Sequence, residues 1–204
     1  MTLAEQLQYL KFSVRTNDPK SQQHSLDALQ WGLIPYWAKD PKIAYRTINA
    51  RAETVDKAPS YRLAFLKRRC LIPADGFYEW RKTAKPKLPF ALRHERRTPV
   101  HLCSGSREKW RDPESGERLR TCTIITGEPN ELVAQIHPRM PVILHEQHHA
   151  AWLGETENGN LKEGGGTFHD YSRMRLVTAS QRPRIRSSAS KAGNSHRKMQ
   201  RRWL

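Results

Sequence analysis

Long apolar runs are missing from this sequence, which has no stretch approaching the ~18 consecutive apolar residues that a membrane-spanning helix needs. The opening residues, MTLAEQLQYLKFSVRTN, also lack a basic start followed by an apolar run, so no secretory signal is visible. Cysteine is scarce: Cys70, Cys103 and Cys122 are the only three, and none has CxxC spacing. This argues against a disulfide framework or a zinc ribbon, and we expect a cytoplasmic protein.

Acidic residues are also few, with 20 against 36 lysines and arginines, which gives a net charge of +16. The excess is uneven, because ten of the basic residues lie from Arg173 onward, where the sequence has no Asp or Glu. A phosphate-bearing partner fits both parts of the chain, since Lys and Arg neutralise phosphates and release counterions. For the C-terminal part alone, a solvated basic tail is an equally acceptable interpretation.

The pattern along the chain divides it into an irregular segment over 1–28, a folded domain over 29–154, and a linker with a basic, disordered tail over 155–204. Within the domain, short apolar and β-branched runs predict strands over 70–74, 77–80, 88–92, 100–103, 121–126 and 141–144. Helices are predicted over 54–67, 131–136 and 145–153. Many short strands with a few helices favour an α+β fold over a doubly wound sheet.

Three segments contain residues that are suited to chemistry. In INARAET, Asn49 and Arg51 alternate on an extended stretch and so face one side. In CLIPADGFYEW, Glu79 lies between two aromatic residues, and partial desolvation would raise its pKa and suit it to acid–base work. In NELVAQIHPRM, His137 ends a short helix beside Arg139. Each signal is weak alone, because a lone Glu in a strand or a His before Pro is usually structural.

Four motifs, WGLIPYWAKD, INARAET, RRCLIPADGFYEWRK and IHPRMPVIL, occur in the order and approximate spacing of the SOS-response-associated peptidase (SRAP) family. The sequence therefore resembles these proteins, which capture abasic sites in single-stranded DNA. The resemblance implies a mixed, mainly antiparallel sheet curled into a barrel-like domain with a few short helices. It also implies a monomer that binds abasic single-stranded DNA, needs no metal or other cofactor, and associates with the nucleoid when bound to DNA.

The resemblance assigns catalytic positions residue by residue. Asn49 matches the family's active-site asparagine. Glu79 matches the glutamate that assists sugar-ring opening and removal of the initiator methionine, and His137 matches the histidine that assists ring opening and crosslink reversal.

Four further positions match the family's DNA-binding residues. Arg51 and Arg139 resemble its phosphate-contacting arginines, and Thr126 matches a polar residue lining the same pocket. Trp37 resembles an aromatic residue that stacks on bases at the lesion, an interaction that tolerates any sequence.

Family members expose a cysteine at position 2, whose α-amine and thiol together trap the abasic aldehyde as a thiazolidine. This sequence has Thr2 and no Cys-Gly-Arg opening, so we expect an N-terminal piece with the nucleophile and its strand to be missing. The family's autoproteolysis and lyase-type crosslinking are therefore uncertain here, and a catalytically inert single-stranded DNA-binding remnant is the alternative. The tail after about Val177 also departs from the family and could reflect a frameshift.

A zinc peptidase is a second alternative, because the residues from His145 to His149 match HExxH. That motif needs a helix with both histidines on one face and the glutamate as general base. The segment begins directly after a predicted strand, and no third ligand follows at a familiar spacing.

Overall fold

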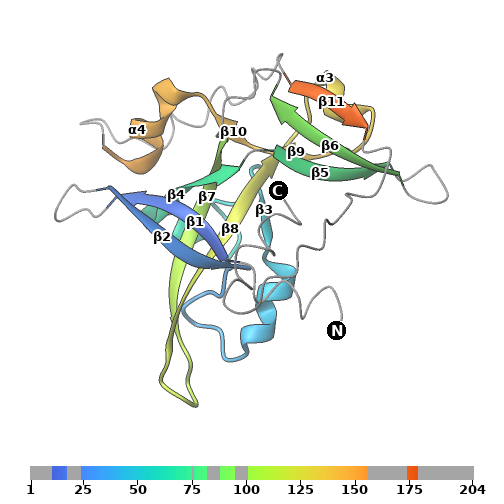
Figure 1. Ribbon diagram of the computed structural model, residues 1–204. Coiled ribbons are helices and arrows are strands. Elements are labelled where there is room, and N and C mark those ends of the chain that lie inside the picture. Colours follow the sequence, from blue (N-terminus) through green and yellow to red (C-terminus); the bar gives the residue numbers. More distant parts are fainter. Residues whose placement is uncertain are drawn as a thin grey trace, which may run out of the picture.

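The computed structural model describes residues 11–17, 24–74, 76–81, 88–94, 101–155 and 174–178. These residues form an eight-stranded and a three-stranded sheet with short helices around them (Figure 1). The strands are β1 Lys11–Asn17, β2 His24–Trp31, β3 Asn49–Arg51, β4 Arg69–Ala74, β5 Gly76–Arg81, β6 Leu88–His94, β7 His101–Arg111, β8 Arg118–Gly127, β9 Met140–Pro141, β10 Ile143–Leu144 and β11 Met174–Thr178. The helices are η1 Pro41–Arg46, α2 Arg62–Lys67, α3 Glu131–Ala134, η2 Glu146–His148 and α4 His149–Leu153.

The larger sheet is barrel-like. Its strand order is β10-β7-β4-β1-β2-β8-β3, with β9 also on β8, and a further pairing of β7 with β8 closes the path from β7 to β8 into a ring. Strand β8 runs parallel to β2 and β3, whereas the other pairs are antiparallel. The prediction of a mixed, mainly antiparallel sheet curled into a barrel-like domain with a few short helices is confirmed.

Apolar residues cover both faces of this sheet, as the continuous apolar sequence of β4 illustrates. Cys70 and Ile72 belong to one buried cluster, whereas Leu71 between them packs into a second cluster with Trp152 of α4 and Phe65 of α2. Successive side chains of a strand point to opposite faces, so a strand buried on both sides has no polar face. The helices α2 and α4 therefore cover the face of the sheet that Leu71 occupies.

Two buried threonines of β8 attach the loop that precedes β3. Thr121 Oγ1 accepts a hydrogen bond from Ile34 N at 3.0 Å, and Thr123 Oγ1 donates one to Ile48 O at 3.1 Å. The loop leaves β2 through Gly32, whose φ of 109° is open to glycine but strained for other residues. These contacts fix the start of β3 beside β8.

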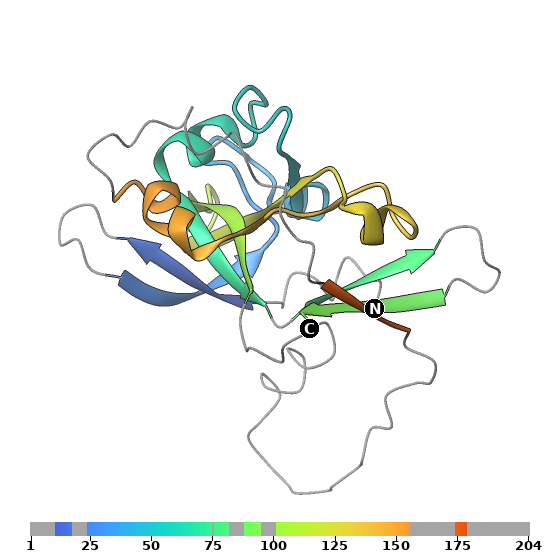
Figure 2. The same ribbon diagram turned by 90° about the horizontal axis from the view of Figure 1, so that it is seen from above.

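The three-stranded sheet has the order β11-β6-β5 and lies to one side of the barrel (Figure 2). Strands β5 and β6 pair antiparallel with Glu79 opposite Phe90. Phe90 and Leu92 reach the same buried cluster as Cys70 and Ile72, so the small sheet shares the core of the large one.

Two predicted segment assignments are wrong where the structure describes them. The segment 1–28 is not irregular throughout, because β1 and the first residues of β2 form a hairpin within it. Alternation was hard to recognise there, since Leu26 on β2 is 68% exposed. The tail over 155–204 contains β11, which pairs with β6. Apart from Glu155, the other residues of both segments lie outside the described ranges.

Most elements predicted within the domain are present, with shifted boundaries. The strands over 70–74, 77–80, 88–92 and 121–126 are each longer than predicted, and 100–103 is only the start of the eleven-residue β7. The helix predicted over 54–67 is confined to α2, because turns occupy 52–61, around Pro59. Among the described residues, no helix is both long and apolar enough to cross a membrane.

Candidate active site

Three strands meet around Thr126 near the end of β8. On one edge of β8, the parallel strand β3 places Arg51 opposite Thr126. On the other edge, β9 places Pro141 opposite Thr126. The segments INARAET and HPRMP are far apart in the sequence, and β8 brings them together on its two sides.

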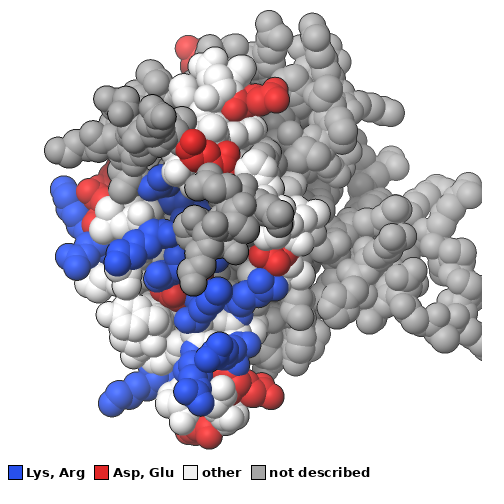
Figure 3. All heavy atoms as spheres, turned by 90° about the vertical axis from the view of Figure 1, so that its left-hand side faces the viewer, with Lys and Arg blue, Asp and Glu red and all other residues white. Residues whose placement is uncertain are grey.

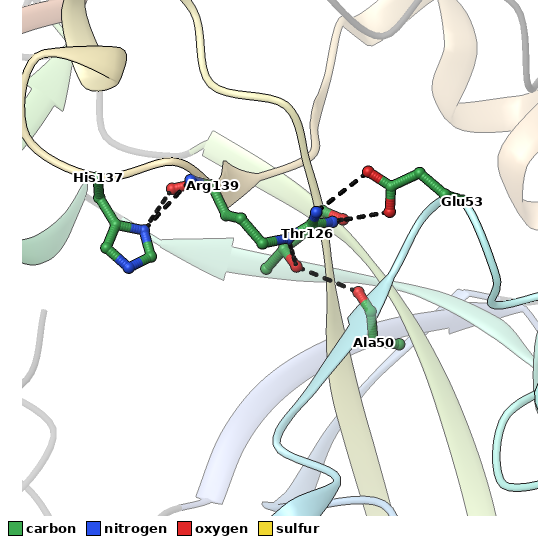
Figure 4. A network of polar contacts seen from close by, with 5 residues as sticks. All are labelled: Ala50, Glu53, Thr126, His137 and Arg139. Carbon is green, nitrogen blue, oxygen red and sulfur yellow. Dashed lines mark hydrogen bonds and ion pairs between the residues drawn. The ribbon is translucent and has the colours of Figure 1, made fainter.

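Arg139 joins these strands through its guanidinium group (Figure 4). Its Nε donates to Thr126 Oγ1 at 3.2 Å, and its Nη2 donates to the Thr126 carbonyl oxygen. The hydroxyl of Thr126 in turn donates to the Ala50 carbonyl oxygen of β3 at 3.3 Å. The buried Thr126 thus orients the Arg139 side chain and attaches it to both neighbouring strands.

Glu53 completes the coordination of Arg139. Its two carboxylate oxygens accept hydrogen bonds from Nη1 at 3.1 Å and Nη2 at 2.9 Å, which is the bidentate geometry of a strong charge-assisted pair. This hydrogen bond to Arg139 is the main cause that holds the pKa of Glu53 below its usual value, with a smaller contribution from the charge of Arg51. Glu53 is therefore ionised at neutral pH.

Glu79 of β5 faces His137, which lies between α3 and β9. The distance between Glu79 Oε1 and His137 Nδ1 is 3.6 Å, and the side chains are 20% and 25% exposed. His137 follows α3, whose first turn is capped by Asn130 Oδ1 accepting from Val133 N at 2.9 Å. An acid and an imidazole at this distance, both partly open to solvent, can exchange protons with a bound molecule.

The turn from His137 to Arg139 links the two groups of residues. His137 Nδ1 lies 3.0 Å from the Arg139 carbonyl oxygen and 3.3 Å from the Arg139 amide nitrogen. Nδ1 accepts from the Arg139 N–H in one tautomer and donates to the Arg139 carbonyl oxygen in the other. Nε2 lies on the opposite edge of the ring, directed away from Arg139 (Figure 4).

The structure places the other predicted site residues differently. Asn49 and Arg51 are exposed on one face of β3, and the backbone oxygen of Asn49 accepts from Tyr61 Oη at 3.1 Å. Trp37 lies in the loop between β2 and η1, 48% exposed. The carbonyl oxygen of the neighbouring Ala38 accepts a hydrogen bond from Trp110 of β7 at 2.7 Å. This hydrogen bond attaches the loop to the β7–β8 hairpin.

Two details differ from the sequence-based interpretation. Tyr78 and Trp80 do not flank the carboxylate of Glu79, because residues next to it in the strand project to the other face. Glu53 was missed, because it lies in the turn that follows β3 and its partner Arg139 is remote in the sequence. A raised pKa of Glu79 stays a prediction.

The three cysteines are buried thiols. Burial raises the pKa of Cys70 and of Cys103 to about 12, and it raises the pKa of Cys122 well above the usual value. Only a thiolate is a good nucleophile, and these groups keep their protons at neutral pH. None of the three can therefore attack an electrophile bound at the surface.

The HExxH segment does not form the helix face that a zinc peptidase needs. His145 precedes the 3-10 helix η2, and His149 Nε2 lies 3.0 Å from the Leu144 carbonyl oxygen, where it acts as a hydrogen-bond donor. Within the described ranges, no group of three or more His, Cys, Asp or Glu side chains could hold a metal ion. The geometry gives the zinc hypothesis no support.

Comparison with curated proteins gives a consistent set of relatives. The chain is 50% identical over 129 residues to the abasic site processing protein YoqW of Bacillus subtilis, covering 63% of this chain and 57% of YoqW. It is 36% identical over 148 residues to the abasic site processing protein HMCES of Gallus gallus, covering 62% of this chain and 44% of HMCES. The chain thus spans less than two thirds of the length of either relative.

Solved structures share the fold. A crystal structure of a protein from Bacteroides thetaiotaomicron superposes with a TM-score of 0.75 at 28% identity, covering 86% of this chain and 75% of that one. A protein from Bordetella bronchiseptica gives a TM-score of 0.70 at 21% identity, which shows the fold alone. The family described as SOS response associated peptidase (SRAP) matches residues 5–182. This match covers most of the sequence, and the chain therefore belongs to the SRAP family.

Proposed function

We propose that this protein processes abasic sites in single-stranded DNA, with Glu79 and His137 as the acid–base pair that opens the damaged sugar. The observation that carries the proposal is the 3.6 Å approach of Glu79 Oε1 to His137 Nδ1 beside the Arg139–Thr126 contacts. The names of the relatives YoqW and HMCES, both abasic site processing proteins, support the same substrate class.

The chemistry of the substrate explains why two such groups are needed. The sugar of an abasic site closes into a hemiacetal, and opening it requires loss of a proton from the C1′ hydroxyl and delivery of a proton to the ring oxygen. A carboxylate of Glu79 can accept the first proton, and a protonated His137 can supply the second. The resulting aldehyde condenses with a primary amine to give an imine, with release of water.

The surrounding residues suit a DNA strand. Arg139 is held by Thr126 with its guanidinium partly exposed, and Arg51 projects from the neighbouring strand β3, so both can contact phosphates. Asn49, on the same face of β3 as Arg51, can hydrogen-bond the sugar. Trp37 offers an exposed ring on which a flanking base can stack.

Stable covalent capture requires an accessible thiolate next to the amine, and the three thiols of this sequence are buried. None of these three thiols can therefore convert the imine, formed with a primary amine of the protein, into a stable thiazolidine. A binding protein without ring-opening activity is the second candidate, and the same burial of the thiols favours it.

The test compares Glu79→Gln with wild type and with Glu128→Gln, a matched loss of an exposed carboxylate beyond the end of β8. Borohydride is added to mixtures with abasic single-stranded DNA, and the trapped imine is quantified on a denaturing gel. We expect Glu79→Gln to slow adduct formation by ~10²-fold or more while the affinity for the strand stays within about twofold. Equal rates for wild type and Glu79→Gln would contradict ring opening by this pair and favour the binding-only function.

A further inference from the structure

The hairpin of β7 and β8 carries two like-charged pairs directly opposite each other. Lys109 is the cross-strand partner of Arg120, and Arg111 is the partner of Arg118. All four side chains are exposed, and because paired residues share a face, they form one row of positive charge along the hairpin. We call these four residues the basic ladder.

Such an arrangement opposes folding. Like charges directly across an antiparallel pair destabilise a sheet, whereas opposite charges stabilise it. Among the described residues, a single ion pair offsets the basic ladder, between Arg120 Nη1 and Asp27 Oδ1 at 3.1 Å. A surface that is arranged against stability in this way is expected where a ligand of the opposite charge binds.

Three acids of the hairpin, Asp112, Glu114 and Glu117, lie in its tip beyond the last pair of the basic ladder. Glu108 is buried on the other face of β7 and pairs with Arg68. The carboxylate of Asp112, in the tip, accepts the backbone N–H groups of Glu114 and Ser115, and these hydrogen bonds hold its pKa below the usual value. Figure 3 shows lysine and arginine side chains gathered across this side of the molecule.

The basic ladder lies at the start of β8 and the candidate active site at its end, and Cys122 and Ile124, on the same face between them, pack into the core. Arg118 and Arg120 are separated from Thr126 by even numbers of residues, so all three lie on one face of β8. Eight residues of strand between Arg118 and Thr126 correspond to about 26 Å at ~3.3 Å per residue. One DNA strand rising about 3.4 Å per nucleotide covers this distance with about eight nucleotides, or fewer when extended.

We propose that the basic ladder is a second DNA-binding surface, which holds the phosphate backbone of the strand at a distance from the lesion. The proposal rests on the proposed function, because it places the lesion of the same strand at Glu79 and His137. The ladder offers Lys and Arg without an exposed aromatic ring, since Trp110 in the same hairpin is only 3% exposed. Its contacts are therefore to phosphates and are independent of sequence.

The test removes one charge from each strand of the hairpin in the double variant Arg111→Gln/Arg118→Gln. The matched control is Arg62→Gln/Lys67→Gln, which removes two exposed charges from α2, the helix that packs on the other face of the sheet. Binding of the full chain to undamaged oligothymidylate is measured as a function of salt. We expect the ladder variant to lower the slope of log K against log salt by ~1.4, at ~0.7 per phosphate contact, and the control to leave it unchanged.

Strand length separates this surface from the active site. Abasic strands with three nucleotides on each side of the lesion are too short to reach the basic ladder, whereas strands with fifteen on each side reach it. The ladder variant should bind the long strand about tenfold more weakly than wild type and the short strand equally well. It should also form borohydride-trapped adduct with the short strand at the wild-type rate, and its melting temperature should not fall, because a repulsive pair is gone.

A salt slope equal to that of the control, or equal losses on short and long strands, would overturn the proposal. Failure of the proposed function has a different signature, in which wild type forms no Glu79-dependent adduct on any strand while the salt slopes still differ between the two double variants.

Discussion

Glu53 accepts two parallel hydrogen bonds from Arg139, of 3.1 and 2.9 Å. These bonds fix the side chain of Arg139, which lies in the same turn as His137. The backbone of Arg139 contacts His137 Nδ1, and His137 faces Glu79. The carboxylate of Glu53 thereby acts on the acid–base pair through an intermediate residue. In the proposed mechanism, Glu53 is therefore a positioning residue.

We expect Glu53→Gln to slow formation of the borohydride-trapped adduct by about tenfold, since small displacements of reacting groups lower rates strongly. Binding to undamaged single strands should be unchanged or stronger, because a negative charge near two arginines is removed. Rates and affinities measured in parallel, with Glu128→Gln as control, test this. A variant with wild-type rate would show that Thr126 alone suffices to hold Arg139.

Acid should weaken the same contact. The pKa of Glu53 is lowered in the folded protein, so its contribution to stability is complete above the unfolded value of ~4.3 and is lost as the pH falls through the folded pKa. Because Glu53 is about half exposed, we expect Glu53→Gln to lower the free energy of unfolding by less than ~1 kcal/mol at pH 7. Urea unfolding at a series of pH values from 7 downward should show the difference between the variants shrinking as the pH falls.

Trp37 is expected to contribute to DNA binding without contributing to stability. Its ring is 48% exposed, and stacking of a base on an aromatic ring is worth ~1–3 kcal/mol. Trp37→Ala should therefore weaken binding to a single strand by about five- to hundredfold, with a melting temperature close to that of wild type. Leu66→Ala, which shortens another exposed apolar side chain on α2, is the control and should bind normally.

The buried thiols make the fold sensitive to alkali. Unfolded cysteines ionise near pH ~8.5, whereas Cys70 and Cys103 keep their protons until about pH 12 in the folded state. The unfolded state then binds fewer protons, so stability falls with rising pH between these values, by up to ~1.4 kcal/mol per pH unit for each thiol. Cys70→Ala should reduce the slope of unfolding free energy against pH over 9 to 11. An unchanged slope would contradict the burial of this thiol.

Gly32 should tolerate no side chain. A Cβ there would lie 2.6 Å from the Ala44 carbonyl oxygen, in addition to the strain of a φ of 109°. We expect Gly32→Ala to lower the free energy of unfolding by ~2–4 kcal/mol. Gly116→Ala is the control, because its φ of 75° is also positive but the nearest atom would be 3.5 Å away, in the Arg111 side chain. A control as damaging as Gly32→Ala would mean that backbone strain, rather than the clash, is responsible.

Strands were predictable where apolar and β-branched residues dominated a segment. TCTIIT in β8 and RCLIPA in β4 indicated strands because apolar and β-branched residues occupy both faces. The hairpin of β1 and β2 was missed, since its pairing depends on β4 and β8 on either side and not on a local pattern. The length of the helix predicted over 54–67 was overestimated. The spacing of apolar residues in this segment is the same for a helix as for the turns that precede Arg62.

The candidate site was predictable only in its residue types. Sequence motifs pointed to Glu79, His137 and Arg139, but their mutual distances follow from pairings between strands that are remote in the chain. Glu53 has no signature of its own, and its role follows from the three-dimensional approach of INARAET to HPRMP on the two edges of β8.

Strand β8 is hydrogen-bonded along both edges, to β7 and β9 on one and to β2 and β3 on the other. Its amides can exchange with solvent only when several strands separate together, so exchange at Thr126 should be as slow as that of the whole barrel. Strand β8, which holds Arg139 through Thr126, therefore keeps its position on the timescale of a reaction at the site. If the site binds DNA as we propose, the motions that accompany binding involve side chains and the short turn that carries His137, and not β8.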